Sequence, residues 1–191
     1  DQTIDVVDTS TGRQILSRIA LGNGNAVAWS PDGSRIACGG KRGVVNIFDA
    51  RTGKETAAFS GLLQREIYAV AWSPDGKRLA FGGYDQLVRV WDALTAKELL
   101  TLRGHAGDVR VLAWSPDGKR LASMGWEGTI RVLDAAKGYE MLSLPGSSQE
   151  AIAWSPDGRC LATISDPEGT IKIYDASRGY AVVKNPEQGK P

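Results

Sequence analysis

The segment Trp72-Ser-Pro-Asp-Gly-Lys-Arg-Leu-Ala-Phe81 decides the fold, because its opening pentapeptide Trp-Ser-Pro-Asp-Gly occurs four times in the chain. The four copies begin at Trp29, Trp72, Trp114 and Trp154, at intervals of 43, 42 and 40 residues. Self-similarity at such a period is the signature of a repeat architecture. An alternating apolar stretch ending in Asp follows each tryptophan at a distance of 20, 20, 20 and 21 residues. This nearly constant interval predicts a rigid strand meander with the variable loops outside it.

Each unit contains four short runs with strand character. In the unit of Trp72 these runs lie at 68–73, 77–81, 87–91 and 98–102, and they are rich in β-branched, aromatic and other apolar residues. Pro-Asp-Gly between the first two runs is a turn sequence, since Pro presets φ, Asp binds nearby backbone and Gly accepts positive φ. No segment has a sustained apolar period of 3.6 residues, so we expect almost no helix. The sequence therefore predicts an all-β protein.

A single four-stranded antiparallel sheet cannot bury both of its faces, so repeated sheets of this size stack radially as the blades of a β-propeller. We predict a partial propeller with a half blade at 1–20, four complete blades at about 21–61, 62–104, 105–146 and 147–184, and a polar tail at 185–191. Closed propellers have about 4–8 blades, so we expect further blades upstream of Asp1. Open apolar sheet faces favour association, so we expect self-association or pairing with the missing blades.

The sequence resembles the WD-repeat propeller family over essentially its whole length. The resemblance rests on Trp-Ser-Pro-Asp-Gly-Lys-Arg-Leu-Ala at 72–80, Val-Arg-Val-Trp-Asp at 88–92 and Leu-Arg-Gly-His at 102–105. TolB-like propellers also use Ser-Pro-Asp-Gly, but Trp-Asp after the third strand and Gly-His before the first strand favour the WD-repeat family. Fold alone does not determine function, because propellers host many functions.

The resemblance also implies a network that holds each blade, built from His before the first strand, Ser or Thr in the second, Asp in the next turn and Trp in the third. The network is incomplete in every unit of this chain. The matching pairs are His105 with Ser123 and Asp85 with Trp91, and the departures are Glu127, Leu133, Leu63 and Phe81. We interpret His105 as a structural cap. We expect Trp91 and the four repeat tryptophans to lie in the core between blades.

Two positions change chemical class from unit to unit and are therefore not constrained by the fold. The turn after the second strand holds, in successive units, Lys41, Tyr84, Trp126 and Asp166. The site four residues before the repeat tryptophan holds Asn25, Tyr68, Arg110 and Glu150. Both positions are expected on one rim. Aromatic and arginine side chains are enriched at protein interfaces. We therefore predict that the partner-binding residues are Lys41, Arg42, Tyr68, Tyr84, Arg110 and Trp126. The alternative for each is an ordinary solvated side chain, or for Trp126 a ring folded over its own sheet.

The composition bears on which kinds of partner the protein binds and on the redox state of its cellular compartment. The 191 residues include 23 Lys and Arg against 22 Asp and Glu, and the two signs are interspersed, so we expect neither nucleic-acid nor membrane binding. Cys38 and Cys160 stand far apart without a Cys-x-x-Cys motif, which favours two free thiols in a reducing, cytoplasmic setting.

No sequence signature of catalysis is present: there is no phosphate-binding glycine loop, metal-ligand spacing or nucleophile elbow. We therefore expect no catalytic residue, metal site or cofactor. The predicted function is a non-catalytic scaffold that presents the propeller rim to a protein or peptide. The alternative is a substrate-binding or regulatory propeller within a larger enzyme.

Overall fold

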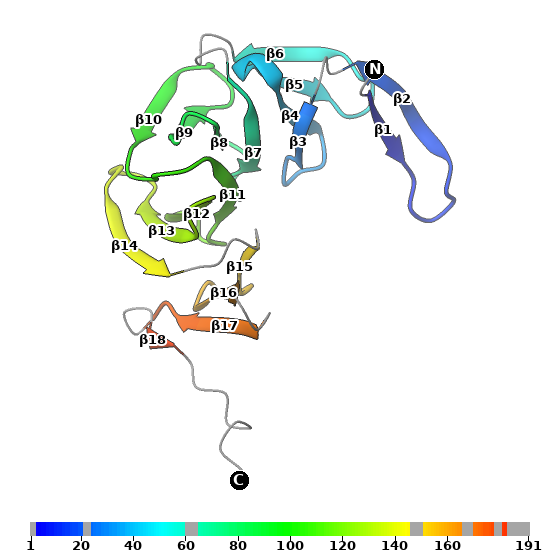
Figure 1. The fold of residues 1–191 in the computed structure, drawn as a ribbon. Coiled ribbons are helices and arrows are strands. Elements are labelled where there is room, and N and C mark those ends of the chain that lie inside the picture. Colours follow the sequence, from blue (N-terminus) through cyan, green and yellow to red (C-terminus); the bar gives the residue numbers. More distant parts are fainter. Residues whose placement is uncertain are drawn as a thin grey trace.

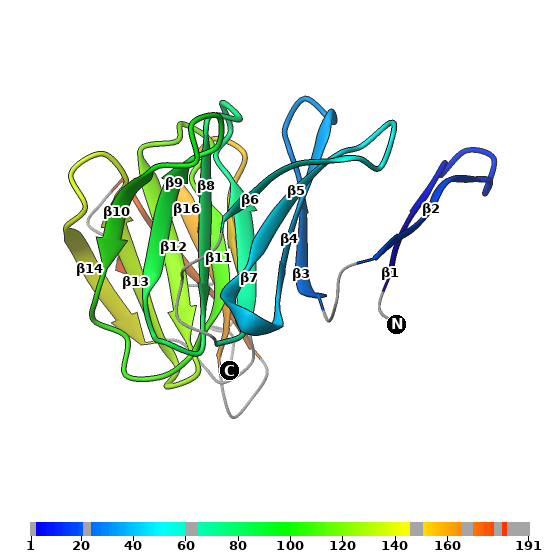
Figure 2. The same ribbon diagram turned by 90° about the horizontal axis from the view of Figure 1, so that it is seen from above.

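The computed structural model describes residues 3–20, 24–59, 65–145, 151–165, 170–177 and 181–182. Their strands form four four-stranded antiparallel sheets and one two-stranded sheet, which confirms the predicted partial β-propeller with four complete blades and a half blade. Figures 1 and 2 show the sheets side by side along an arc in chain order. The tail at 185–191 lies outside the described residues.

Each complete blade is a meander in which consecutive strands are neighbours. The half blade consists of β1 (Thr3–Val7) and β2 (Gln14–Ala20). The first blade contains β3 (Gly24–Trp29), β4 (Arg35–Gly40), β5 (Val45–Asp49) and β6 (Glu55–Phe59), with the short 3-10 turn η1 (Lys41–Gly43) after β4. The second contains β7 (Ile67–Trp72), β8 (Arg78–Gly83), β9 (Val88–Asp92) and β10 (Glu98–Leu102). The third contains β11 (Val109–Trp114), β12 (Arg120–Gly125), β13 (Thr129–Asp134) and β14 (Glu140–Pro145), and the fourth β15 (Ile152–Trp154), β16 (Cys160–Ser165), β17 (Thr170–Asp175) and β18 (Ala181–Val182).

The repeated pentapeptide closes the hairpin between the first and second strands of every complete blade. In the second blade the buried Ser73 hydroxyl donates to Asp75 Oδ1 at 2.6 Å and accepts the N–H of Arg78 at 2.9 Å. The N–H of Gly76 reaches Ser73 O at 2.9 Å, and Gly76 has φ of +67°, which glycine adopts without a steric penalty. The turn thus depends on contacts within six residues, and this local chemistry sets the register of each sheet.

A second recurring turn joins the third and fourth strands. Asp49 ends β5, and its Oδ1 accepts the backbone N–H of Thr52 at 2.7 Å, while its own N–H donates to Lys54 O at 2.9 Å. The half blade repeats these contacts, because Asp8 Oδ1 accepts the N–H of Thr11 at 2.9 Å and Asp8 N–H donates to Arg13 O at 2.8 Å. The strands β1 and β2 are therefore equivalent to the third and fourth strands of a complete blade.

The core lies in layers between neighbouring blades rather than within one blade. Successive residues of a strand point to opposite faces of the sheet. On β8, Leu79 packs toward the first blade and Ala80 toward the third, and both are fully buried. The same alternation fills the layer between the third and fourth blades, where Ala122 meets Leu161.

The repeat tryptophans lie in these layers with one exception. Trp72 and Trp114 are only 7% and 8% exposed, as predicted. Trp154 and Trp91 are partly buried and pack against core clusters. The core prediction is wrong for Trp29, which is 50% exposed. The reason is geometric, since each tryptophan packs against the first two strands of the preceding blade, and before the first blade the described residues supply only β1 and β2.

Candidate protein-interaction rim

The candidate rim is formed where the turn after the second strand meets the loop before the first strand of the same blade. In the second blade the N–H of Tyr84 donates to Glu66 O at 3.0 Å, and in the third the N–H of Trp126 donates to Asp108 O at 2.8 Å. A Cβ on Gly83 would collide with the Glu66 carbonyl, so this close approach of two backbones needs glycine. The two variable positions of the repeat are therefore neighbours on one edge of the propeller.

Arg110 brings three of the predicted residues together across a blade boundary. Its guanidinium carbon lies 4.0 Å from the ring centroid of Tyr68 on the second blade and 5.0 Å from that of Trp126 on the third. One guanidinium nitrogen lies 3.2 Å from Asp108 Oδ2. We call Tyr68, Arg110 and Trp126 the aromatic–arginine cluster. Trp126 remains 56% exposed, so much of its ring is open to solvent.

The other predicted rim residues lie near this cluster. Tyr84 is 44% exposed, and the guanidinium of Arg65 lies 4.8 Å from its ring centroid. Lys41 and Arg42 are exposed on η1, which lies beside β7, the strand that carries Tyr68. Two further variable-position residues, Asp166 and Glu150, lie outside the described residues.

Sequence comparison missed Arg65 and Asp108. Asp108 lies six residues before Trp114, in the same repeat position as Glu66, and Arg65 lies seven residues before Trp72. A charged residue in a loop is an ordinary solvated side chain in the sequence, and only the structure shows which ring or guanidinium it contacts. The surroundings also perturb Tyr68, whose pKa is raised by partial burial and then by the nearby Glu66 and Asp108 carboxylates.

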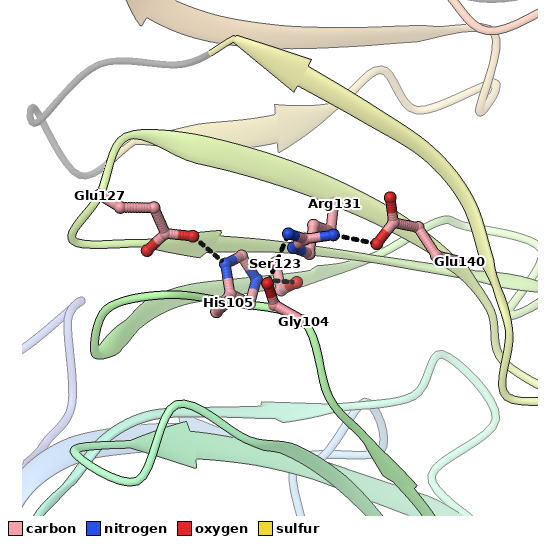
Figure 3. A network of polar contacts seen from close by, with 6 residues as sticks. All are labelled: Gly104, His105, Ser123, Glu127, Arg131 and Glu140. Atoms are coloured by element: carbon pink, nitrogen blue, oxygen red, sulfur yellow. Dashed lines mark hydrogen bonds and ion pairs between the residues drawn. The ribbon is translucent and has the colours of Figure 1, made fainter.

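A separate polar network supports the third blade beneath the rim (Figure 3). His105 Nδ1 lies 2.6 Å from Glu127 Oε1, and Nε2 lies 2.8 Å from Ser123 Oγ. A carboxylate accepts only, so Nδ1 carries the proton and Nε2 accepts the Ser123 hydroxyl. Arg131 extends the network to the Gly104 carbonyl and to Glu140.

Glu127 therefore does what the family pattern assigns to Asp, which corrects the interpretation of Glu127 as a departure that interrupts the network. Its extra methylene is accommodated because Gly125 has no side chain, and a Cβ there would overlap the Glu127 carboxylate. Burial lowers the pKa of His105, and the hydrogen bond with Glu127 offsets this only in part. Burial is the largest single influence on the pKa of Glu127 and raises it, but the hydrogen bond and charge of His105 together with backbone N–H groups outweigh burial, so the pKa lies below its usual value.

Ser123, His105 and Glu127 have the connectivity of a hydrolytic triad, so their accessibility decides what they can do. Ser123 is fully buried and His105 is 8% exposed. A nucleophile must reach the reacting atom of a substrate, which the Ser123 hydroxyl cannot do from this position. The arrangement is a structural brace that satisfies the buried hydroxyl of Ser123 and the buried imidazole of His105.

The second blade replaces this network with a different pair of contacts. Arg89 and Asp85 form an ion pair at 2.6 Å in which both side chains are largely buried. Phe81 stands where the third blade has Ser123, and Trp91 packs on it at 5.8 Å and on Phe59 at 5.2 Å between ring centroids. Among the described residues the buried Trp91 Nε1 has no hydrogen-bond partner, so here aromatic packing replaces polar bracing.

The profile of the family described as WD domain, G-beta repeat matches this chain four times, at residues 23–49, 53–92, 96–134 and 139–175. The chain belongs to the WD-repeat family. A comparison with curated protein sequences gives no match.

Two similar solved structures support this assignment at the level of fold. A chain in the crystal structure of the mitotic checkpoint complex has a TM-score of 0.79 and 25% identity, and the match covers 94% of this chain and 58% of that one. The structure of U3-55K has a TM-score of 0.73 and 22% identity, and the match covers 84% of this chain and 51% of that one. This WD-repeat chain thus spans little more than half the length of either.

Two searches of the described residues bear on other kinds of site. Within those ranges no group of three or more His, Cys, Asp and Glu side chains is placed to hold a metal ion. Over the same part of the chain, no helix has the length and apolar character needed to cross a bilayer.

Proposed function

We propose that this WD-repeat chain is a non-catalytic scaffold that binds a protein or peptide through the rim residues Lys41, Arg42, Tyr68, Tyr84, Arg110 and Trp126. The observation that carries the proposal is the aromatic–arginine cluster, in which Arg110 contacts two aromatic rings from adjacent blades while Trp126 stays 56% exposed. Trp, Tyr and Arg dominate interface hot spots, and a preassembled cluster loses little side-chain entropy on binding.

Charge and context support a protein or peptide partner over nucleic acid or a membrane surface. The chain carries a formal charge of +1, and the rim holds acidic groups, Glu66 and Asp108, among its basic ones. The similar chain at 25% identity is part of the mitotic checkpoint complex. We further propose a reducing, cytoplasmic setting, since Cys38 and Cys160 are both free thiols and burial raises the pKa of Cys38 to about 12.

The test is affinity capture of the partner by the wild-type chain, followed by titration of variants against the captured partner. Trp126→Ala and Arg110→Ala should each weaken binding by about 1–3 kcal/mol, as hot-spot truncations do. Tyr139→Ala is the matched control, because Tyr139 is an aromatic residue with 49% exposure in the turn before β14, at the opposite end of the third blade. Equal affinity of both rim variants and the wild type would refute the rim assignment.

A further inference from the structure

The turn after the second strand carries a charged residue seven positions before the aspartate that ends the third strand. In the second and third blades this residue is acidic and points into its own blade. Asp85 lies 2.6 Å from Arg89, and Glu127 lies 2.6 Å from His105 (Figure 3). The first blade has Arg42 at the same position, and its side chain is exposed. The charge that the other two blades use internally is therefore reversed in sign and presented outward here.

The backbone of Arg42 is strained. Its φ of +75° lies in the left-handed region, which a residue with a side chain adopts at a cost and glycine adopts freely. Gly43 follows with φ of +66°, so the turn already contains one glycine in this conformation. Non-glycine residues in such conformations cluster at functional sites, where binding rather than folding requires the side chain. Arginine at position 42 thus strains the turn and supplies a charged side chain to the rim.

Two further cations lie at the same boundary between the first and second blades. Lys41 precedes Arg42 on η1, which lies beside β7, and Arg65 comes two residues before β7. A Cβ on Gly39, two residues before Lys41, would collide with Ile67, so η1 and the start of β7 share one edge. Lys41, Arg42 and Arg65 are all exposed, and within the part of the chain that the structure describes none of them forms an ion pair. We call these three residues the basic corner.

The carboxylates at this boundary do not cancel the charge of the basic corner. Asp85 is already paired with Arg89 at 2.6 Å, and among the described residues here Glu66 is the remaining acidic side chain. The neighbouring segment 60–64, which lies outside the described residues, has the sequence Ser-Gly-Leu-Leu-Gln and carries no charge. The boundary between the first two blades therefore has an excess of positive charge, which attracts anionic groups.

Exposed aromatic rings continue the rim from the basic corner toward the third blade. The guanidinium of Arg65 lies 4.8 Å from the ring centroid of Tyr84, which is 44% exposed. Beyond it, Arg110 contacts Tyr68 of the second blade and Trp126 of the third, and the Trp126 ring is 56% exposed. A ligand that lies along this arc meets cations at the first blade and open aromatic surface at the third.

We propose that the rim recognises an acidic peptide, whose Asp or Glu side chains bind the basic corner while a nearby aromatic or large aliphatic residue packs on Trp126. This inference rests on the rim function proposed above and names the chemistry of the partner. Arginine binds carboxylates through two parallel hydrogen bonds, and complementary charge contributes specificity at an interface. A nucleic acid fits less well, because its phosphates need cations along the whole path, whereas the carboxylates of Glu66 and Asp108 also lie on this rim.

The test uses fluorescent synthetic peptides that carry a run of Glu, a spacer of none to several Gly, and a terminal Phe. Their binding to the 191-residue protein is measured by fluorescence anisotropy at low and at high salt concentration. We expect the best spacing to bind about tenfold more tightly than the same peptide with Gln in place of Glu, since three exposed cations each contribute a modest amount. This preference should shrink at high salt, and Phe→Ala in the peptide should weaken binding by about fivefold or more.

The decisive protein variant is Arg42→Gly, which removes a cation and relieves the backbone strain together. It should weaken binding of the acidic peptide by about threefold to fivefold and raise the melting temperature by up to about 4 °C. Arg51→Ala is the control for charge, because Arg51 is exposed in the turn after β5, at the opposite end of the same blade. Ala96→Gly is the control for strain, since it relieves a φ of +54° with no change of charge. Both controls should leave the affinity for the acidic peptide unchanged.

Several results would overturn the proposal. These are equal binding of the Glu and Gln peptides at every spacing, an affinity that Arg42→Gly leaves unchanged, and tighter binding of a single-stranded oligonucleotide than of any acidic peptide. A lower melting temperature of Arg42→Gly would show that the arginine serves the fold, and it too would count against the proposal. The rim function is judged separately by the captured partner. If Trp126→Ala weakens that partner while the protein shows no preference for acidic peptides, the rim is retained and the acidic partner is rejected.

Discussion

Removing an arginine that joins two neighbouring blades should loosen their junction by a predictable amount. Arg35, Arg78 and Arg120 each contact the repeat tryptophan and the turn-glycine carbonyl of the next blade, and we call this contact the arginine–tryptophan clasp. Arg78 donates to Gly118 O at 2.7 Å and to Ala135 O at 2.9 Å, and its guanidinium lies 4.6 Å from the Trp114 ring centroid. Hydrogen bonds to charged groups contribute about 1.5–3 kcal/mol each, and a cation–π contact about 0.5–2 kcal/mol. Because Arg78 is partly exposed and water can replace it at the carbonyls, we expect Arg78→Ala to cost about 3 kcal/mol.

Arg35 is the internal comparison, since it makes the same ring contact at 4.5 Å but one such carbonyl bond among the described residues, to Gly76 O. Arg35→Ala should therefore cost about 1.5 kcal/mol less than Arg78→Ala. Arg78→Lys should recover only part of the loss, because an ammonium lacks the planar fork.

Urea unfolding followed by circular dichroism and tryptophan fluorescence measures these differences, with the slope m checked for each variant so that a changed transition is not mistaken for a changed stability. Blades contact only their neighbours, so Arg78→Ala could also separate one transition into two, and non-coincident probes would reveal it. An Arg78→Ala loss below about 0.5 kcal/mol would show that the clasp does not hold the blades together, and a loss no larger than that of Arg35→Ala would show that the bond to the Ala135 carbonyl adds no stability.

Three further outcomes are expected. Burial lowers the pKa of His105, so the neutral imidazole contributes stability that is fully present above the unfolded pKa of about 6.5. This stability is lost as the pH falls from there through the lower folded pKa. His105→Gln should therefore weaken the pH dependence of the urea midpoint between about pH 7 and 5. Ala96 has φ of +54°, so Ala96→Gly should stabilise by up to about 1 kcal/mol, whereas Gly12→Ala, at φ of +69°, should destabilise by about 1 kcal/mol in thermal melts. Trp126→Ala should change stability by less than about 0.5 kcal/mol, while Trp114→Ala, which empties a core layer, should cost about 3–5 kcal/mol, and equal losses would place Trp126 in the core.

The sheets could be predicted because their turns are local. Ser73, Asp75 and Gly76 determine one hairpin with contacts inside a single pentapeptide, and Asp49 determines the next turn in the same way. Four copies of both signals leave little freedom in strand order or register. The closeness of the two variable rim positions was predictable for the same reason, since a meander fixes which of its turns share an edge.

The contacts between blades could not be predicted in this way. The recurring arginine at 35, 78 and 120 is visible in the sequence, but its partners lie about 40 residues away on another sheet, at a distance that only the stacking of blades determines. The exposure of Trp29 escaped prediction for the same reason, because a residue's place in the repeat does not say what stands beside its blade. Glu127 was misjudged because its fit depends on the missing side chain of Gly125.

The rim residues and the clasps lie at opposite ends of each sheet and are under different constraints. At the end with the Pro-Asp-Gly turns, the residues that join neighbouring blades are nearly invariant, since each must meet the same partner on the next sheet. At the other end the constant element is a backbone hydrogen bond, from Tyr84 to Glu66 in the second blade and from Trp126 to Asp108 in the third, and this bond places no demand on the side chain. Where the fold does not constrain the side chain, its residue type can be determined by the binding of a partner. The same separation predicts that Trp126, large, aromatic and 56% exposed, can be replaced at little cost in stability, whereas Trp114, of the same residue type in the same blade and 8% exposed, cannot be replaced without opening the core.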